Sequence, residues 1–175
     1  SDLGQELERP APLAACTVPG KEQGATPSTV IDDAGKNSKI FAGLLAHAMA
    51  CDQTRVFNVL VGTVAMRKRG SSFTWHTATH EEAVDEKLGY QKEVFSFLSW
   101  ANQTFAEFIG MLDNLKEGSG TVLDRTVVAW HTDHGDARTH SLENIPVMTV
   151  GSGGGRLKTG MHIAAPGDPV AREIG

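Results

Sequence analysis

Apolar residues recur at steps of three and four along two stretches of the chain, and this spacing predicts two helices. The first follows Ser38, a residue suited to capping, in the run KIFAGLLAHAMACDQT. The second covers residues 83–116 and ends at the run EGSG. Its apolar positions predict a core-facing stripe: Phe95, Leu98, Ala101, Phe105, Phe108, Ile109, Leu112 and Leu115.

Three apolar runs rich in β-branched residues predict buried strands. They are RVFNVLVG at 55–62, RTVVAW at 125–130 and IPVMTVG at 145–151. Helices and buried strands in this order predict an α/β domain with all three strands in one sheet, and a parallel, right-handed crossover through the long helix. Ligands bind beyond the strand ends in such sheets, so the loops that follow the strands are the places to seek a site.

The beginning of the chain differs in composition from the rest. Residues 10–37 are rich in Pro, Gly, Ala, Thr and Asp and show no sustained period, so we expect an extended arm over 1–37 and a folded domain over 38–175. The opening run SDLGQELERP lacks the charged start and apolar centre of a signal peptide. Its pattern is that of a helix that began earlier, and we expect the chain to be the C-terminal part of a longer protein.

Composition narrows the function classes. Hydrophobic residues make up 40% of the chain and charged residues 21%, as in ordinary globular domains. The net charge of -5 disfavours nucleic-acid binding, and no apolar run is long enough to cross a membrane. The basic run MRKRG at 66–70 is interpreted as a solvated loop. The two cysteines, Cys16 and Cys51, leave two states open, a single bridge or two reduced thiols.

Five of the seven histidines fall in two short stretches, WHTATHEEAVDE and HTDHGDARTH. His76 and His80 lie in a long segment without a clean period, and their H-x-x-x-H spacing would place both imidazoles on one face of a helical turn, as in zinc sites. Asp133 and His134 follow the second predicted strand, where Gly135 allows a sharp turn.

A third element of this pattern is His140, which precedes the third strand. Three imidazoles and a carboxylate suit Zn, Mn or Fe better than Ca or Mg. We therefore expect the two loops to converge at one edge of the sheet; the alternative is that the histidines are unrelated and bonded locally. We interpret His131 as a packing residue or as one that supports the metal ligands, and His47 as a helix residue in the core or at the surface. His162 is a weak candidate for a metal ligand.

The order of an H-x-x-x-H pair, a DHG turn after a strand and a later His before Ile-Pro resembles the alkaline-phosphatase-like superfamily. That group includes nucleotide pyrophosphatases, cofactor-independent phosphoglycerate mutases and sulfatases. The resemblance implies a mixed, mostly parallel sheet flanked by helices, with this chain as its C-terminal part. It also implies two metal positions, one with His76, His80 and His140 and the other with Asp133 and His134.

A closer likeness covers nearly the whole chain. The runs LERPAPLAAC, CDQTRVFNVLVG, HTATH, MLDNLKEGSGTVLDRTVVAW and THSLENIPVMTVGSGGGRLKTGMHI are similar to the C-terminal half of the uncharacterised bacterial HxxSHH-type family. This likeness implies a periplasmic or secreted protein. Thr79 stands where that motif has Ser, and Glu81 stands where it has the second of two paired histidines.

Two functions follow from these resemblances. The first is a metal-dependent hydrolase of phosphate or sulfate esters. Its nucleophile (Ser, Thr or formylglycine) and an early Asp have no match in these 175 residues, so they are expected in the N-terminal part of the same protein. The second is a non-catalytic periplasmic structural or interaction subunit that retains the fold and binds partner subunits.

Overall fold

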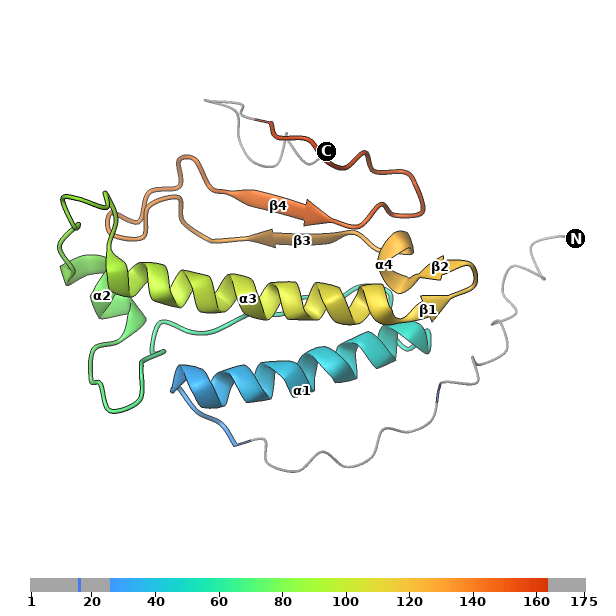
Figure 1. Ribbon diagram of the computed structural model, residues 1–175, viewed down its shortest axis with the longest axis horizontal. Helices are drawn as coiled ribbons and strands as arrows, with labels where there is room; N and C mark the ends of the chain where they lie inside the picture. Colours follow the sequence, from blue (N-terminus) through green and yellow to red (C-terminus); the bar gives the residue numbers. More distant parts are fainter. Residues whose placement is uncertain (1–15, 17–25, 164–175) are drawn as a thin grey trace, which may run out of the picture.

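The computed structural model of the protein describes residue 16 and residues 26–163, in which helices and two small sheets form three layers (Figure 1). In chain order the elements are α1 (Ile31–Ala50), α2 (Trp75–Glu81), α3 (Lys92–Asn114), β1 (Lys116–Glu117), β2 (Gly120–Thr121), α4 (Val122–Arg125), β3 (Val128–His131) and β4 (Val147–Val150). The long helix α3 lies between α1 on one side and the β3–β4 pair on the other. Helix α2 lies at the amino end of α3.

Helix α1 begins earlier than the sequence predicts. It starts at Ile31, inside the predicted arm, and the prediction of a start after Ser38 is wrong. The first turn carries Asp32 and Asp33, whose charges are favourable at a helix amino end. Gly35, which suggested a linker, lies against α3: a β-carbon there would be 3.3 Å from Trp100 Nε1. The rest of the predicted arm, apart from residues 16 and 26–30, lies outside the described residues.

The long helix is shorter than the predicted 83–116. It starts at Lys92 because residues before it form a turn around Asp85, whose carboxylate accepts hydrogen bonds from the Lys87 and Leu88 amides (2.9 and 3.0 Å). The hydrogen bond with the Lys92 ammonium, together with these amides, lowers the pKa of the Asp85 carboxyl. At the other end, the EGSG run forms the turn between β1 and β2.

The second and third predicted strands exist as β3 and β4, and they pair with each other. The ladder is antiparallel, with Val128 opposite Val150 and His131 opposite Val147. The first predicted strand is not found: residues 55–62 are assigned no strand, and none of their backbone N–H groups donates to another described backbone carbonyl. Within the described part of the chain, both paired sheets are therefore antiparallel, and the mostly parallel sheet stays a prediction.

The core lies where α1, α3, α4 and β3 meet. Its buried members are Ala46, Phe105, Leu112, Val122 and Val128. The Phe105 ring stacks on the Trp130 indole, with centroids 4.7 Å apart. These contacts confirm the prediction that the Phe-rich helix faces the core.

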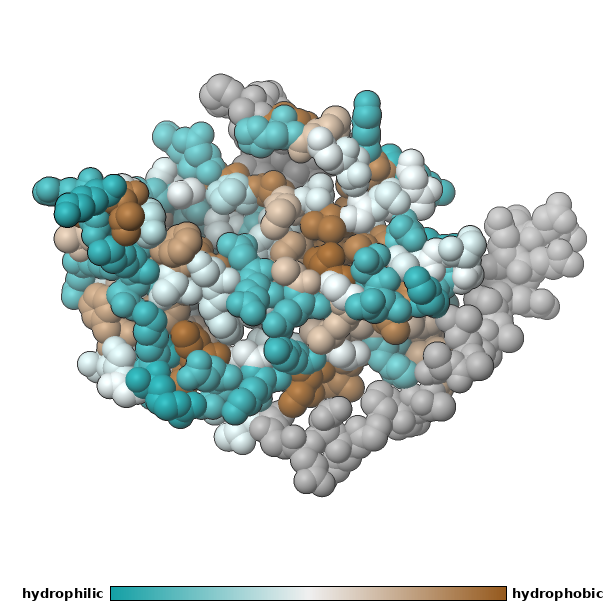
Figure 2. All heavy atoms as spheres, viewed as in Figure 1, coloured by the Kyte–Doolittle hydropathy of each residue, from teal (hydrophilic) through white to brown (hydrophobic). Residues whose placement is uncertain are grey.

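Parts of the predicted apolar stripe face solvent instead. Phe95 is 53% exposed and Leu98 is 36% exposed, so the expectation of a core position is wrong for both. Phe41 and Leu44 on α1 are also exposed, and Figure 2 shows apolar side chains at the surface over this helix. No helix among the described residues combines the length and the apolar character that a membrane crossing needs.

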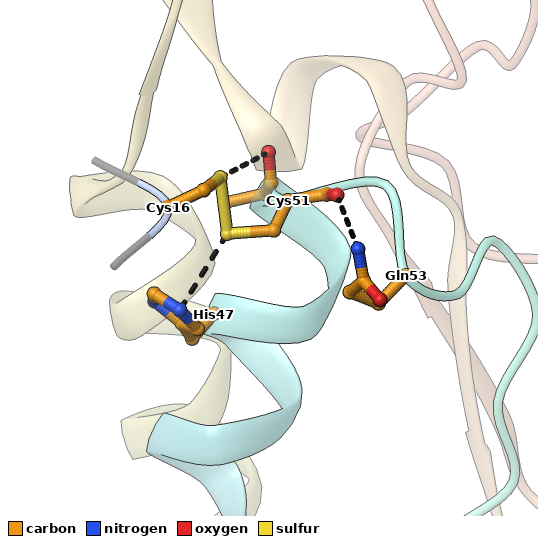
Figure 3. Close-up of a disulfide and its surroundings, with 5 residues drawn as sticks. Cys16, His47, Cys51 and Gln53 are labelled. Carbon is orange, nitrogen blue, oxygen red and sulfur yellow. Dashed lines mark hydrogen bonds between the residues drawn. A yellow bond between two sulfur atoms is a disulfide. The ribbon is translucent and has the colours of Figure 1, made fainter. Parts of the chain in front are cut away.

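A disulfide joins Cys16 to Cys51 at the carboxyl end of α1 (Figure 3), which settles the alternative that the sequence left open. The two Cα atoms are 5.4 Å apart, and 35 positions separate the residues in the chain. The imidazole of His47, one helical turn earlier, has its Nε2 atom 3.5 Å from Cys51 Sγ. The bridge therefore holds the arm at Cys16 to the end of α1.

Shortening a buried core side chain should destabilise the fold strongly. Leu112 is fully buried, so Leu112→Ala removes buried apolar contacts and leaves a cavity. We expect the free energy of unfolding to fall by about 2–5 kcal/mol, measured by urea denaturation. Leu98→Ala on the same helix is the matched control and should cost less than about 1 kcal/mol. Equal losses for the two variants would contradict this assignment of the core.

Candidate histidine site

Helix α2 presents His76 and His80 on one face, as their spacing predicts. Thr74 is the N-cap residue of the helix, and its hydroxyl accepts the Thr77 amide at 3.1 Å. The ring centroids of His76 and His80 are 4.7 Å apart. His80 is half-buried and His76 is exposed. The segment predicted to be a loop thus forms a short helix here, and the helix fixes the relative position of the two imidazoles.

Thr79, which stands where the motif discussed above has Ser, lies in the last turn of α2. Its side chain is buried, and its hydroxyl donates to the His76 carbonyl at 2.7 Å. A serine could make the same bond, because the hydroxyl lies on the same Cβ atom. Glu81, in contrast, is exposed. The Thr-for-Ser difference therefore leaves the histidine positions of α2 intact.

The second histidine loop joins β3 to β4 and is closed by its own hydrogen bonds. The Gly135 amide donates to the Ser141 carbonyl at 2.9 Å, and the Ser141 amide donates to the Asp136 carbonyl at 3.0 Å. Gly135 lies so close to the returning chain that a β-carbon there would be 1.8 Å from the Glu143 carbonyl oxygen. Only glycine fits at this position, which is the sharp turn that the sequence predicts.

The His140 side chain connects the β3–β4 loop to α2. Its φ angle is 55°, in the left-handed region that is costly for a residue with a side chain. Such strain persists only where the surroundings hold it, and it is concentrated at functional sites. In this conformation the His140 Nε2 atom lies 3.3 Å from His80 Nε2. The two stretches that hold the histidines, separated by 60 residues, therefore meet.

Four imidazoles form a continuous row in the order His76, His80, His140, His134. The His80 and His140 centroids are 5.0 Å apart, and those of His140 and His134 are 5.1 Å apart. The Asp133 carboxylate lies 3.4 Å from His134 Nδ1, but its side chain is 92% exposed and contacts only this end of the row. The structure thus brings together all five residues that the sequence singled out, as a chain of neighbouring contacts.

The remaining histidines lie outside this row. His131 is exposed, and its Nδ1 atom is 3.2 Å from the Thr132 carbonyl. His47 is beside the disulfide, and His162 is exposed. His47 lies in α1, as the sequence predicts, whereas the exposed His131 is not packed in the core and its supporting role stays a prediction.

The row contains donor atoms suited to a metal but not a complete metal centre. Within residue 16 and residues 26–163, no three His, Cys, Asp or Glu side chains surround a common point. The His80 and His140 Nε2 atoms are nevertheless 3.3 Å apart. Two nitrogens bound to one tetrahedral Zn²⁺ at about 2.0–2.1 Å are separated by about 3.3–3.4 Å. This pair therefore has the spacing of two ligands.

Sequence reasoning missed the residues that hold α2 in place. The Gln91 side-chain amide donates to the carbonyls of Ala78, Thr79 and Glu82, at 3.1, 3.1 and 2.8 Å. The Glu82 carboxylate accepts the Glu93 amide at 2.8 Å and so caps α3. No spacing rule predicts such contacts, because they join residues nine to thirteen positions apart across a turn.

Arg138, in the β3–β4 loop, also reaches α2. Its guanidinium donates from Nε to the Thr79 carbonyl at 3.4 Å and from Nη2 to the Glu82 carbonyl. The residue lies within the run that carries His134 and His140, but an exposed arginine in a polar loop has no sequence signal that marks a partner. Only the folded chain shows this contact.

Substitution of the tight-turn glycine should displace the loop. In Gly135→Ala the new methyl group collides with the Glu143 carbonyl, so the β3–β4 loop must move. We expect changed NMR shifts for the ring protons of His134 and His140 and unchanged shifts for His47. Gly110→Ala, where a β-carbon meets nothing within 4 Å, is the control and should leave all three rings unchanged. Unshifted His134 and His140 rings in Gly135→Ala would contradict the loop geometry.

Comparisons with known proteins identify no relative: no described protein family, curated protein or solved structure matches the chain. Any function for this chain therefore rests on the geometry of its own side chains and on the motifs that they carry.

Proposed function

We propose that the histidine row binds a divalent transition metal and that the protein is a metal-dependent hydrolase of phosphate or sulfate esters. The observation that carries this proposal is the 3.3 Å separation of the His80 and His140 Nε2 atoms. Imidazole nitrogens favour Zn, Mn or Fe over Ca and Mg. His80 and His140 would hold the ion together, and a third ligand requires a side-chain rotation of one neighbour, His76 or His134.

The carboxylate end of the row offers a second position. Asp133 and His134 are adjacent there, 3.4 Å apart, and the exposed carboxylate can turn toward an ion. A bound metal would stabilise the charge that develops on ester oxygens during displacement. The exposure of His76, Asp133 and His140 leaves this edge open to a bulky ester. The described residues supply ligands, whereas we expect the nucleophile from the N-terminal part of the protein.

A second candidate function is a non-catalytic subunit that binds partner polypeptide. The observation that favours it is residues 55–62, an extended apolar run whose amides donate to no described carbonyl. Val56 and Leu60 are 86% and 85% exposed, while Phe57 packs edge-on against Phe108 at 5.7 Å. One face of the run thus covers the helices and the other is bare. Strands from the N-terminal part of the same protein would complete a mixed, mostly parallel sheet there.

We also propose a periplasmic or secreted location in a bacterium, in keeping with the HxxSHH resemblance. The Cys16–Cys51 bridge supports it, because disulfides persist in oxidising compartments. Nucleic acid is not proposed as a ligand. The basic run is partly neutralised by ion pairs, Lys68 with Glu93 at 2.6 Å and Arg69 with Asp33 at 2.8 Å.

Removal of one central imidazole should strongly weaken metal binding. We expect His80→Ala to lower zinc content and any esterase activity at least tenfold, because it breaks the His80–His140 pair; metal analysis by mass spectrometry measures this. His131→Ala is the matched control, since His131 lies at the end of β3 outside the row. Far-ultraviolet circular dichroism should be unchanged in both. Wild-type zinc content in folded His80→Ala would rule out the metal site.

Residues 55–62, which we call the open run, should have amides that are protected from hydrogen exchange when a partner strand is present. Amides of residues 55–62 should exchange rapidly with deuterium in the 1–175 chain, because no described carbonyl accepts them. In the complex with the N-terminal part they should exchange at least tenfold more slowly. The paired amides of β3 and β4 serve as the control and should be protected in both samples. Equal, rapid exchange of 55–62 in both would exclude strand pairing there.

A further inference from the structure

We propose that Arg138 is a positioning residue that sets the His80–His140 separation by fastening the β3–β4 loop to the carboxyl end of α2. The contact is direct: Nε and Nη2 of one guanidinium donate to the Thr79 and Glu82 carbonyls, respectively. The role in metal binding rests on the proposed function, whereas the role in placing the two imidazoles does not.

The acceptors of Arg138 explain why a cation is suited to this position. Thr79 is in the last turn of α2, and Glu82 is its C-cap residue. Carbonyl groups at a helix carboxyl end lack helical partners and carry the negative end of the helix dipole, so a positive charge there is favourable. The planar guanidinium offers two donors in a fixed fork, which can bind two carbonyls at once, whereas a lysine ammonium is a compact point charge on a flexible chain.

These carbonyls belong to a rigid part of the molecule. Gln91, which precedes α3, donates to the same Thr79 and Glu82 oxygens at 3.1 and 2.8 Å. The Glu82 carboxylate in turn caps α3 through the Glu93 and Val94 amides. Arg138 therefore attaches its loop to α2 and α3 together, and not to a free helix end.

On the other side, the backbone of Arg138 belongs to the same hydrogen-bonded turn as His140. The Arg138 amide donates to Asp136 Oδ1 at 2.8 Å, and Asp136 forms an antiparallel bridge with Ser141, the residue after His140. His140 thus lies within a closed turn whose position follows that of Arg138. Between the described residues of α2 with its C-cap and this turn, the side-chain hydrogen bonds are those of Arg138 and the His80–His140 pair. Without Arg138, the His80–His140 pair would be the remaining side-chain hydrogen bond between these described segments.

The test compares Arg138→Ala and Arg138→Lys with the wild-type chain. Arg138 is exposed, so both variants should fold, with circular dichroism as the check. The control is Arg156→Ala, an exposed arginine after β4. The first readout is the nuclear Overhauser effect between ring protons of His80 and His140 in metal-free protein. The second is the affinity for Co²⁺, followed by its visible absorption.

We expect Arg138→Ala to lose the His80–His140 Overhauser effect and to weaken Co²⁺ binding about 10–100-fold, the usual cost of removing a group that orients metal ligands. Arg138→Lys should recover part of both, and Arg156→Ala should match the wild type. An Overhauser effect retained in Arg138→Ala, or absent from the wild type, overturns the proposal. If the wild type binds no Co²⁺ but the effect depends on Arg138, the metal function fails and the positioning role stands.

Discussion

The candidate site depends on how the carboxyl end of α2 is held. A helix of seven residues is too short to be stable in water on its own, because nucleation costs more than a few hydrogen bonds return. Its stability must come from tertiary contacts. The Gln91 side-chain amide donates to carbonyls at the carboxyl end of α2. Two residues of this helix, Ala78 and Thr79, are buried. The indole of Trp75, its first residue, stacks on the Phe97 ring with centroids 5.6 Å apart. If this end were released, His76 and His80 would lose their common face.

Glu82 connects this constraint to the long helix. Its backbone carbonyl accepts from Gln91 and Arg138, while its carboxylate caps α3. Both contacts are favoured by the helix dipoles. The hydrogen-bond donors and the Arg138 cation lie at the carboxyl end of α2, and the Glu82 carboxylate lies at the amino end of α3. The amino end of α3 and the carboxyl end of α2 are therefore fixed relative to each other by one residue. The histidine site lies on this junction, and the distant core of α1, α3 and β3 provides the support for α3.

The site and the open run are different kinds of feature. The histidine row is polar, partly exposed and held by hydrogen bonds, whereas residues 55–62 are apolar and lack backbone partners among the described residues. Metal binding by the histidine row can be tested in the chain as it stands. In the second proposed function, the open run would pair with other polypeptide.

The sequence by itself determined the features that depend on neighbouring positions. The steps of three and four placed the core face of α3, including Phe105 and Leu112, and the β-branched runs placed β3 and β4. The H-x-x-x-H spacing predicted the common face of His76 and His80, and the turn at Gly135 was also visible. Each of these follows from local geometry, namely the helical repeat, the strand preference or the freedom of glycine.

Tertiary structure alone decided what depends on residues far apart in the chain. The early turns of α1 pack against α3, where Trp100 lies close to Gly35, and the bridge between Cys16 and Cys51 spans 35 positions. The meeting of the two histidine stretches and the contacts of Arg138 with α2 join residues 56–60 positions apart. Such contacts leave no period in the sequence, because they arise only when packing brings the segments together. Likewise, an apolar run predicts an extended conformation, but whether it becomes a strand depends on a neighbouring strand that can accept its hydrogen bonds.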